Sequence, residues 1–191
     1  MFGDNDYAAP AAWTLIRART TALGFDMPSE ANTGALLRLL AASKPGGRML
    51  ELGTGTGLAT AWLLDGLDAS ASLTSVDIDP LVQEIAREVL KDDRLRFVLA
   101  DGLDYVREQG AESFDLIFAD AWPGKYEGLD QTLALLRRGG LYVIDDMQPQ
   151  PNWPDGHQAR VDDLVARLES RSDLVVTRLS WASGLIVGAK A

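Results

Sequence analysis

The sequence predicts one α/β domain in which helices cover both faces of a mostly parallel sheet. From residue 46 onward, short apolar runs alternate with segments of helical spacing, and each of the first five runs ends at or just before an acidic residue. A glycine-rich turn joins the first run to a helix. Runs that are apolar throughout indicate strands buried on both faces, as in a parallel sheet covered by helices. We expect a single domain over residues 1–191, with a helical cap in residues 1–45 and the core in residues 46–191.

Local signals predict each element of this core. The predicted strands are residues 48–52, 73–76, 95–99, 114–119, 141–144, 174–179 and 184–187. The predicted helices are residues 7–23, a helix capped by Ser29, residues 59–64, residues 80–90, a segment through Tyr105 and Val106, residues 129–136 and residues 158–168. Asp79 fits the N-cap of the helix over residues 80–90, and the residues from Arg137 to Gly140 fit a helix end. Only a few residues around Trp181 join the last two strands, so these strands form an antiparallel hairpin.

Composition and charge exclude several classes of function. The chain carries 18 Lys and Arg against 28 Asp and Glu, a net charge of −10, which would repel nucleic acid and anionic membranes. It has no cysteine, which fits a cytoplasmic location. No apolar run approaches the ~20 residues that span a bilayer. The first residues include Asp4 and Asp6, which does not fit a signal peptide.

Acidic residues follow the first five predicted strands. They are Glu51, Asp77, Asp101, Asp120 and the pair Asp145 and Asp146. In an open parallel sheet the ligand crevice lies outside the carboxyl ends of the strands, so these carboxylates should gather at one edge. Crowded carboxylates disfavour ionisation unless cations lie among them. Capping of a helix is the alternative role for Asp101, as it is for Asp79.

The turn Gly53-Thr54-Gly55-Thr56-Gly57 indicates a ligand that approaches bare backbone. Dinucleotide-binding turns share this feature, but Leu58 stands where their third glycine belongs, which argues against a nicotinamide dehydrogenase. Asp77 lies about 20 residues past the turn, where an acidic side chain accepts hydrogen bonds from a ribose. Asp101 and Gly102 end the next strand and can border an adenine. Together these residues predict a nucleoside site.

The order of these motifs resembles the class I S-adenosylmethionine-dependent methyltransferases. The motifs are Glu-Leu-Gly-Thr-Gly-Thr-Gly, Val-Asp-Ile-Asp, Ala-Asp-Gly, Phe-Ala-Asp-Ala and Gly-Gly-Leu-Tyr-Val-Ile-Asp-Asp, within residues 29–147. More narrowly, the chain resembles the small cation-dependent O-methyltransferases of the catechol and caffeoyl-CoA type. The fold class expected is then a Rossmann-like doubly wound sheet of seven strands in the order 3-2-1-4-5-7-6, and residues 46–191 form a cofactor-binding core.

The resemblance implies roles for individual residues in binding S-adenosylmethionine. Glu51, Gly53, Thr54 and Gly55 would line its methionine part, Asp77 and Ile78 its ribose, and Asp101 and Gly102 its adenine. Ser29 and Asp120 match family positions that touch the cofactor.

The resemblance also implies a divalent metal on three oxygen ligands, Asp120, Asp145 and Asp146, where the third is usually Asn. Such ligands suit Mg²⁺, Mn²⁺ or Ca²⁺. The alternative is that Asp146 only caps or solvates its loop.

Lys125 departs from the family pattern, in which a catalytic lysine follows the aspartate by three positions. Pro123 occupies that position here, and Lys125 is displaced by two. Asp120 and Lys125 are the predicted catalytic pair. The alternatives are that Lys125 is a solvated surface residue and that His157 acts as the base.

The expected function is S-adenosylmethionine-dependent methyl transfer to a hydroxyl of a small molecule, assisted by a metal if one binds. Trp122, Tyr126 and Trp153 would either wall a flat acceptor ring or simply pack the loops. One alternative is a cofactor-binding protein of the same fold without turnover, with a regulatory or assembly role. A nucleic-acid methyltransferase fits the charge poorly. The helix over residues 7–23 could form a homodimer contact or a lid.

Overall fold

The structure is a computed structural model that describes residues 7–191, and its elements alternate along the chain as the sequence predicts. The strands are β1 (Arg48–Leu52), β2 (Ser72–Asp77), β3 (Leu95–Leu99), β4 (Phe114–Ala119), β5 (Leu136–Ile144), β6 (Leu174–Leu179) and β7 (Leu185–Lys190). The helices are α1 (Trp13–Leu23), α2 (Ala31–Ala42), α3 (Leu58–Gly66), α4 (Pro80–Val89), α5 (Gly102–Glu108), α6 (Trp122–Lys125), α7 (Leu129–Ala134) and α8 (His157–Glu169). Residues 1–6, with Asp4 and Asp6, lie outside the described part.

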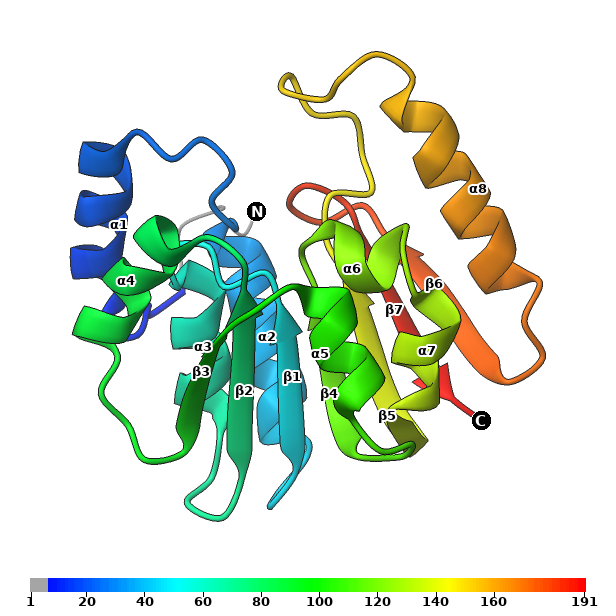
Figure 1. Cartoon of the computed structure of the whole chain (residues 1–191), viewed down its shortest axis with the longest axis horizontal. Helices are drawn as coiled ribbons and strands as arrows, with labels where there is room; N and C mark the ends of the chain where they lie inside the picture. The colour runs from blue at the N-terminus through cyan, green and yellow to red at the C-terminus, as the bar shows by residue number, and fades with distance from the viewer. Residues whose placement is uncertain (1–6) are drawn as a thin grey trace.

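The seven strands form one sheet in the order β3-β2-β1-β4-β5-β7-β6, which confirms the predicted order. β1 to β5 pair in parallel, and β7 pairs antiparallel with both β5 and β6. Figure 1 shows helices packed on both sides of the twisted sheet. The predicted doubly wound architecture with a C-terminal antiparallel hairpin is therefore confirmed.

Alternating side chains of the strands build two apolar cores, one on each face. Met49 of β1 and Phe118 of β4 pack with residues of α1, α2, α3 and α4. Leu50 and Ile117, their neighbours along the same strands, pack with residues of α5, α7 and α8 on the other face. Successive residues of a strand point to opposite faces, so strands covered on both sides must be apolar throughout.

Two predicted helix caps are confirmed, and a third is wrong. The Asp79 carboxylate accepts a hydrogen bond from the Leu81 N–H at 2.8 Å at the start of α4. The Asp101 carboxylate accepts one from the Leu103 N–H at 2.8 Å at the start of α5. Ser29 does not cap α2, which begins at Ala31, because its hydroxyl is used elsewhere.

The boundaries of two further elements differ from the prediction. α1 begins at Trp13 and not at residue 7, since proline cannot continue a helix and Pro10 lies just before it. β5 begins at Leu136, so the segment from Arg137 to Gly140 belongs to a strand and does not end a helix. The register of β4 against β5 shifts within this segment, and the extra residues are accommodated as an irregularity.

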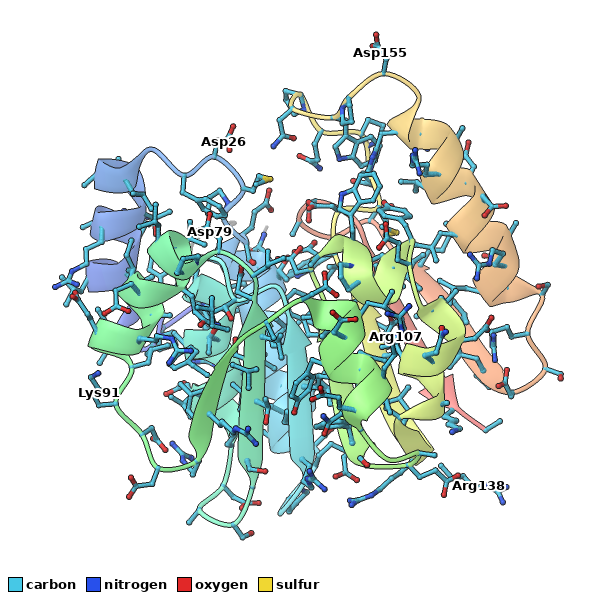
Figure 2. The ribbon with its side chains drawn as sticks, viewed as in Figure 1. Asp26, Asp79, Lys91, Arg107, Arg138 and Asp155 are labelled. Carbon is cyan, nitrogen blue, oxygen red and sulfur yellow. The ribbon has the colours of Figure 1, made fainter. Side chains whose placement is uncertain are left out.

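The carboxyl ends of the parallel strands and two long loops meet at one end of the molecule. Figure 2 labels Asp26, Asp79 and Asp155 at this end, with Arg138 at the opposite end. The loop after α1 and the loop before α8 rise above the sheet edge there (Figure 1). Within residues 7–191, each helix is too short or too polar to cross a membrane.

Candidate active site

A cleft of about 630 Å³ opens at the carboxyl ends of β1 to β5. Its lining includes every predicted site residue but one: Ser29, Gly53, Thr54, Gly55, Asp77, Ile78, Asp101, Gly102, Asp120, Lys125, Asp145 and Asp146. The exception is Glu51. The topology of the sheet therefore brings together residues that are far apart in the sequence, as the rule for open parallel sheets predicts.

The glycine turn after β1 forms the floor of the cleft and depends on bare backbone. Gly53 has φ 100°, and a Cβ at this position would lie 2.7 Å from the Asp120 carbonyl oxygen. Gly57 has φ 94° and occupies the N-cap position of α3. The free N–H groups at the start of α3 and the positive end of its dipole therefore lie next to the turn.

Asp77 at the end of β2 holds the turn in place. One of its carboxylate oxygens accepts a hydrogen bond from the Gly55 N–H at 2.7 Å, and the other accepts from the Asp79 N–H at 2.9 Å. The side chain is only partly buried and borders the cleft. Asp77 is therefore placed to accept hydrogen bonds from a diol that lies over the turn.

Glu51 does not line the cleft, which corrects the role that the sequence predicts for it. Its side chain is fully buried and accepts hydrogen bonds from the hydroxyls of Thr60 in α3, at 2.6 Å, and of Ser75 in β2. It points from β1 to α3 and β2, beneath the turn. Burial raises the pKa of Glu51 to about 8, so the folded protein holds this carboxyl largely protonated at neutral pH.

A buried chain of hydrogen bonds links Glu51 to the glycine turn, and the sequence analysis missed it. The Ser75 hydroxyl donates to Glu51, so the Thr54 hydroxyl donates to Ser75, at 2.6 Å. The Gln83 amide in turn donates to Thr54 at 3.0 Å. The available signals were a serine inside an apolar strand and a glutamine on the buried side of α4. These hydrogen bonds tie the turn to β1, β2 and α4, although the other Glu51 oxygen, Oε1, is buried without a hydrogen-bond partner among the described residues.

The acidic rim contains Asp120, Asp145 and Asp146, with Lys125 buried among them. The Lys125 Nζ lies 3.6 Å from one Asp120 oxygen, and the other accepts a hydrogen bond from the Ser29 hydroxyl at 2.9 Å. Burial raises the pKa of Asp120 and Asp145, and the Lys125 ammonium opposes this rise. Lys125 is only 4% exposed, so the alternative of a solvated surface lysine is wrong.

The donor set does not fit the predicted divalent metal. Among residues 7–191, no three Asp, Glu or His side chains are arranged so that they could hold an ion. Both oxygens of Asp120 have partners, and one oxygen of Asp145 accepts from the Ser183 hydroxyl and from the Asp146 N–H. Asp146 has φ 57°, which aspartate tolerates. We therefore derive no chemical step through a metal.

Aromatic rings from two loops and two helices form one wall of the cleft. The Tyr126 hydroxyl lies 3.1 Å from the His157 Nε2, and the Trp153 ring contacts the His157 ring at a tilt of 51°, with centroids 4.5 Å apart. Trp122 contacts Tyr126 edge-on at 5.5 Å. Burial lowers the pKa of His157 below its ordinary value, which favours the neutral form of the imidazole. The Nδ1 atom of this imidazole is buried without a hydrogen-bond partner in the part of the chain that is described.

Comparison with known proteins agrees with this geometry. A family model described as a methyltransferase domain matches residues 50–147. One relative is a protein of Mycolicibacterium smegmatis whose name describes it as an O-methyltransferase. It is 33% identical over 159 residues, which cover 80% of this chain and 70% of that protein. An O-methyltransferase relative from Mycobacterium sp. strain KMS is 33% identical over 117 residues, 58% of this chain, and the match spans only 53% of the relative's length.

Solved structures share the fold over nearly the whole chain. A Corynebacterium glutamicum protein superposes with a TM-score of 0.84 at 28% identity, covering 97% of this chain and 92% of that one. The O-methyltransferase TomG from Streptomyces achromogenes, solved with S-adenosylmethionine, superposes with a TM-score of 0.82 at 23% identity, covering 98% and 92%. At that identity, TomG is evidence for the fold alone.

The fold, the family model and these relatives define a class I S-adenosylmethionine-dependent methyltransferase. The chain belongs to this family, and its sequence relatives carry names that describe them as O-methyltransferases.

Proposed function

We propose that the protein binds S-adenosylmethionine in the cleft and promotes transfer of the methyl group to a hydroxyl of a small molecule. The main support for the proposal is that the glycine turn, Asp77 and the acidic rim line the same cleft. The names of the O-methyltransferase relatives support the same activity.

In the half of the cleft that would hold S-adenosylmethionine, backbone groups and carboxylates would make the contacts with the cofactor. Asp77 would bind the ribose hydroxyls, and Asp101 and Gly102 would border the adenine. One oxygen of the Asp101 carboxylate caps α5, so the other oxygen would be the one left to face the adenine. The acidic rim would favour the positive charge of the sulfonium and of the methionine amine.

The chemistry needs alignment more than activation. Bound S-adenosylmethionine supplies a methyl group that is already activated on a positively charged sulfur. The cleft residues would hold an acceptor oxygen in line with that group and exclude water. The hydroxyl proton would leave to a base, for which the neutral imidazole of His157 is the candidate on the aromatic wall. Divalent-metal assistance is not part of the proposal, because both Asp120 oxygens and one Asp145 oxygen already have partners.

Replacing Asp77 by alanine should weaken binding of S-adenosylhomocysteine by about 10- to 100-fold, because charged hydrogen bonds to the ribose contribute roughly 1.5–3 kcal/mol. Calorimetric titration measures the change. Asp79→Ala is the matched control, since the Asp79 carboxylate caps α4. The Asp79→Ala variant should lose about 1 kcal/mol of stability, and its affinity for S-adenosylhomocysteine should stay within a few fold of the wild-type affinity. Equal binding by Asp77→Ala and the wild type would contradict the ribose role.

The aromatic wall suits a flat acceptor such as a phenol. Trp153→Ala should raise KM for an aromatic acceptor by about tenfold with a smaller change in kcat, because the lost ring contact serves binding. Trp181→Ala is the control, since Trp181 lies outside the cleft lining and its indole N–H donates to the Asn32 carbonyl. An unchanged KM in Trp153→Ala, measured by steady-state kinetics, would remove this wall from the acceptor site.

A panel of phenols, catechols and aliphatic alcohols tests the proposed reaction directly. Methylated product detected by mass spectrometry for at least one acceptor supports methyl transfer. Tight binding of S-adenosylhomocysteine with no product from any acceptor would instead favour the alternative, a cofactor-binding protein with a regulatory or assembly role.

Small molecules remain the proposed partners, because acidic side chains at the cleft would repel nucleic acid and anionic membranes. A homodimer through residues 7–23 and a cytoplasmic location stay predictions of the sequence.

A further inference from the structure

We infer that the Lys125 ammonium takes the place of the divalent cation at the acidic rim, so that this enzyme holds its acceptor oxygen against a fixed positive charge of its own. The part of this inference that concerns the acceptor rests on the proposed function. The part that concerns the cation rests on the geometry of the rim alone.

The burial of Lys125 needs compensation, and the rim supplies it. A buried ammonium is costly unless acidic groups are close. Lys125 is 4% exposed, and its Nζ lies 3.6 Å from the Asp120 carboxylate. Asp145, which is 2% exposed, lines the same cleft as Lys125. Among the described residues that line the cleft, Lys125 is the one Lys or Arg.

The local backbone explains how a lysine displaced by two positions still reaches the rim. Pro123 and Gly124 leave the helical region inside α6, and Gly124 has φ 89°. A Cβ on Gly124 would lie 2.9 Å from the Leu52 Cδ1, so the turn packs closely against β1. The Tyr142 hydroxyl donates to the Gly124 carbonyl, which fixes the turn from below. This loop absorbs the two additional residues and directs Lys125 inward.

A divalent ion and this ammonium would compete for the same carboxylates. Mg²⁺ and Ca²⁺ need several oxygen ligands at roughly 2.0–2.6 Å. Lys125 lies against one Asp120 oxygen, Ser29 donates to the other, and Ser183 donates to Asp145. A second cation at this point would also meet the repulsion of the buried ammonium.

The ammonium would serve the reaction as a stabiliser of charge. As the O–CH3 bond forms and the S–CH3 bond breaks, the acceptor oxygen loses its proton to a base and the sulfur keeps the electron pair. Negative charge that develops on the oxygen before the bond is complete would face the Lys125 ammonium in a site sheltered from water. A metal ion performs this task as a Lewis acid.

Titration with Mn²⁺, followed by electron paramagnetic resonance, tests the inference without relying on turnover. We expect the wild type with S-adenosylhomocysteine to show no stoichiometric Mn²⁺ binding at concentrations up to about 1 mM. Lys125→Met removes the charge at similar side-chain length and should bind Mn²⁺ at least tenfold more tightly than the wild type. Adding Asp145→Asn to Lys125→Met should abolish the acquired binding. Circular dichroism verifies that each variant is folded.

Stoichiometric Mn²⁺ binding by the wild type that Asp145→Asn removes would overturn the inference. The absence of binding in folded Lys125→Met would overturn it as well, since the lysine would then not be what excludes the ion. If Lys125→Met does not fold, Lys125→Gln replaces it. The titration of the wild type still decides whether the rim binds Mn²⁺ when Lys125 is present. Binding of S-adenosylhomocysteine is measured separately. If the protein did not bind it, the proposed function would be wrong, and the Mn²⁺ titration would still test whether Lys125 excludes the metal.

Discussion

Replacing Gly53 by alanine should abolish measurable binding of S-adenosylhomocysteine and lower the free energy of unfolding by about 3 kcal/mol or more. The backbone at Gly53 has φ 100°, which a residue with a Cβ adopts only under strain. The new Cβ would lie 2.7 Å from the Asp120 carbonyl oxygen and 2.9 Å from its carbon, both backbone atoms. The turn must therefore move away from β4, and the cofactor floor moves with it. Urea denaturation and calorimetric titration measure the two effects.

Gly139→Ala is the matched control for this change. Gly139 also has a positive φ, 73°, but no atom lies within 4 Å of the place that a Cβ would take there, at the opposite end of β5. This substitution should cost only about 1 kcal/mol in backbone strain and leave cofactor binding unchanged. If Gly53→Ala behaved like Gly139→Ala in both measurements, the close approach of the turn to Asp120 would be unimportant.

Glu51→Gln should remove a large pH dependence of stability. The pKa of Glu51 is about 8 in the folded protein against an ordinary 4.5, so between these values the folded state holds a proton that the unfolded state lacks. The contribution of Glu51 to the free energy of unfolding therefore falls as pH rises, by about 1.4 kcal/mol per pH unit. From pH 5 to pH 8, the stability of the wild type relative to Glu51→Gln should decrease by about 4 kcal/mol.

Urea denaturation at pH 5, 6, 7 and 8 checks this expectation. Glutamine keeps an oxygen for the Ser75 and Thr60 hydroxyls, so the variant should fold. Glu169→Gln is the control, because Arg178 lowers the pKa of the exposed Glu169 carboxyl and its loss cannot remove a decline toward high pH. Parallel stability curves for the wild type and Glu51→Gln would mean that the Glu51 carboxyl is ionised in the folded protein.

The sheet and the location of the site follow from local patterns. Strands apolar throughout require cover on both faces, and the connection around Trp181 is too short for anything except a hairpin. The acids after five strands must then share one edge, and in the structure all of them except Glu51 line the cleft there. This prediction succeeds because the strand order alone brings the ends of these strands to the same edge of the sheet.

The direction in which a side chain points could not be predicted in the same way. Glu51 precedes the turn directly, yet strand alternation and the partners Ser75 and Thr60 hold it beneath the floor. Lys125 looked displaced in the sequence, but the turn at Gly124 depends on tertiary contacts with Leu52 and Tyr142. Both outcomes are set by packing between distant segments.

A crystal structure of the protein with S-adenosylhomocysteine tests the central claim most directly. The account predicts one molecule over residues 53–57, with its ribose hydroxyls on the Asp77 carboxylate and its sulfur beside the rim that holds Lys125. Density for the nucleoside anywhere else, or a cleft that stays without it at saturating concentration, would contradict the account.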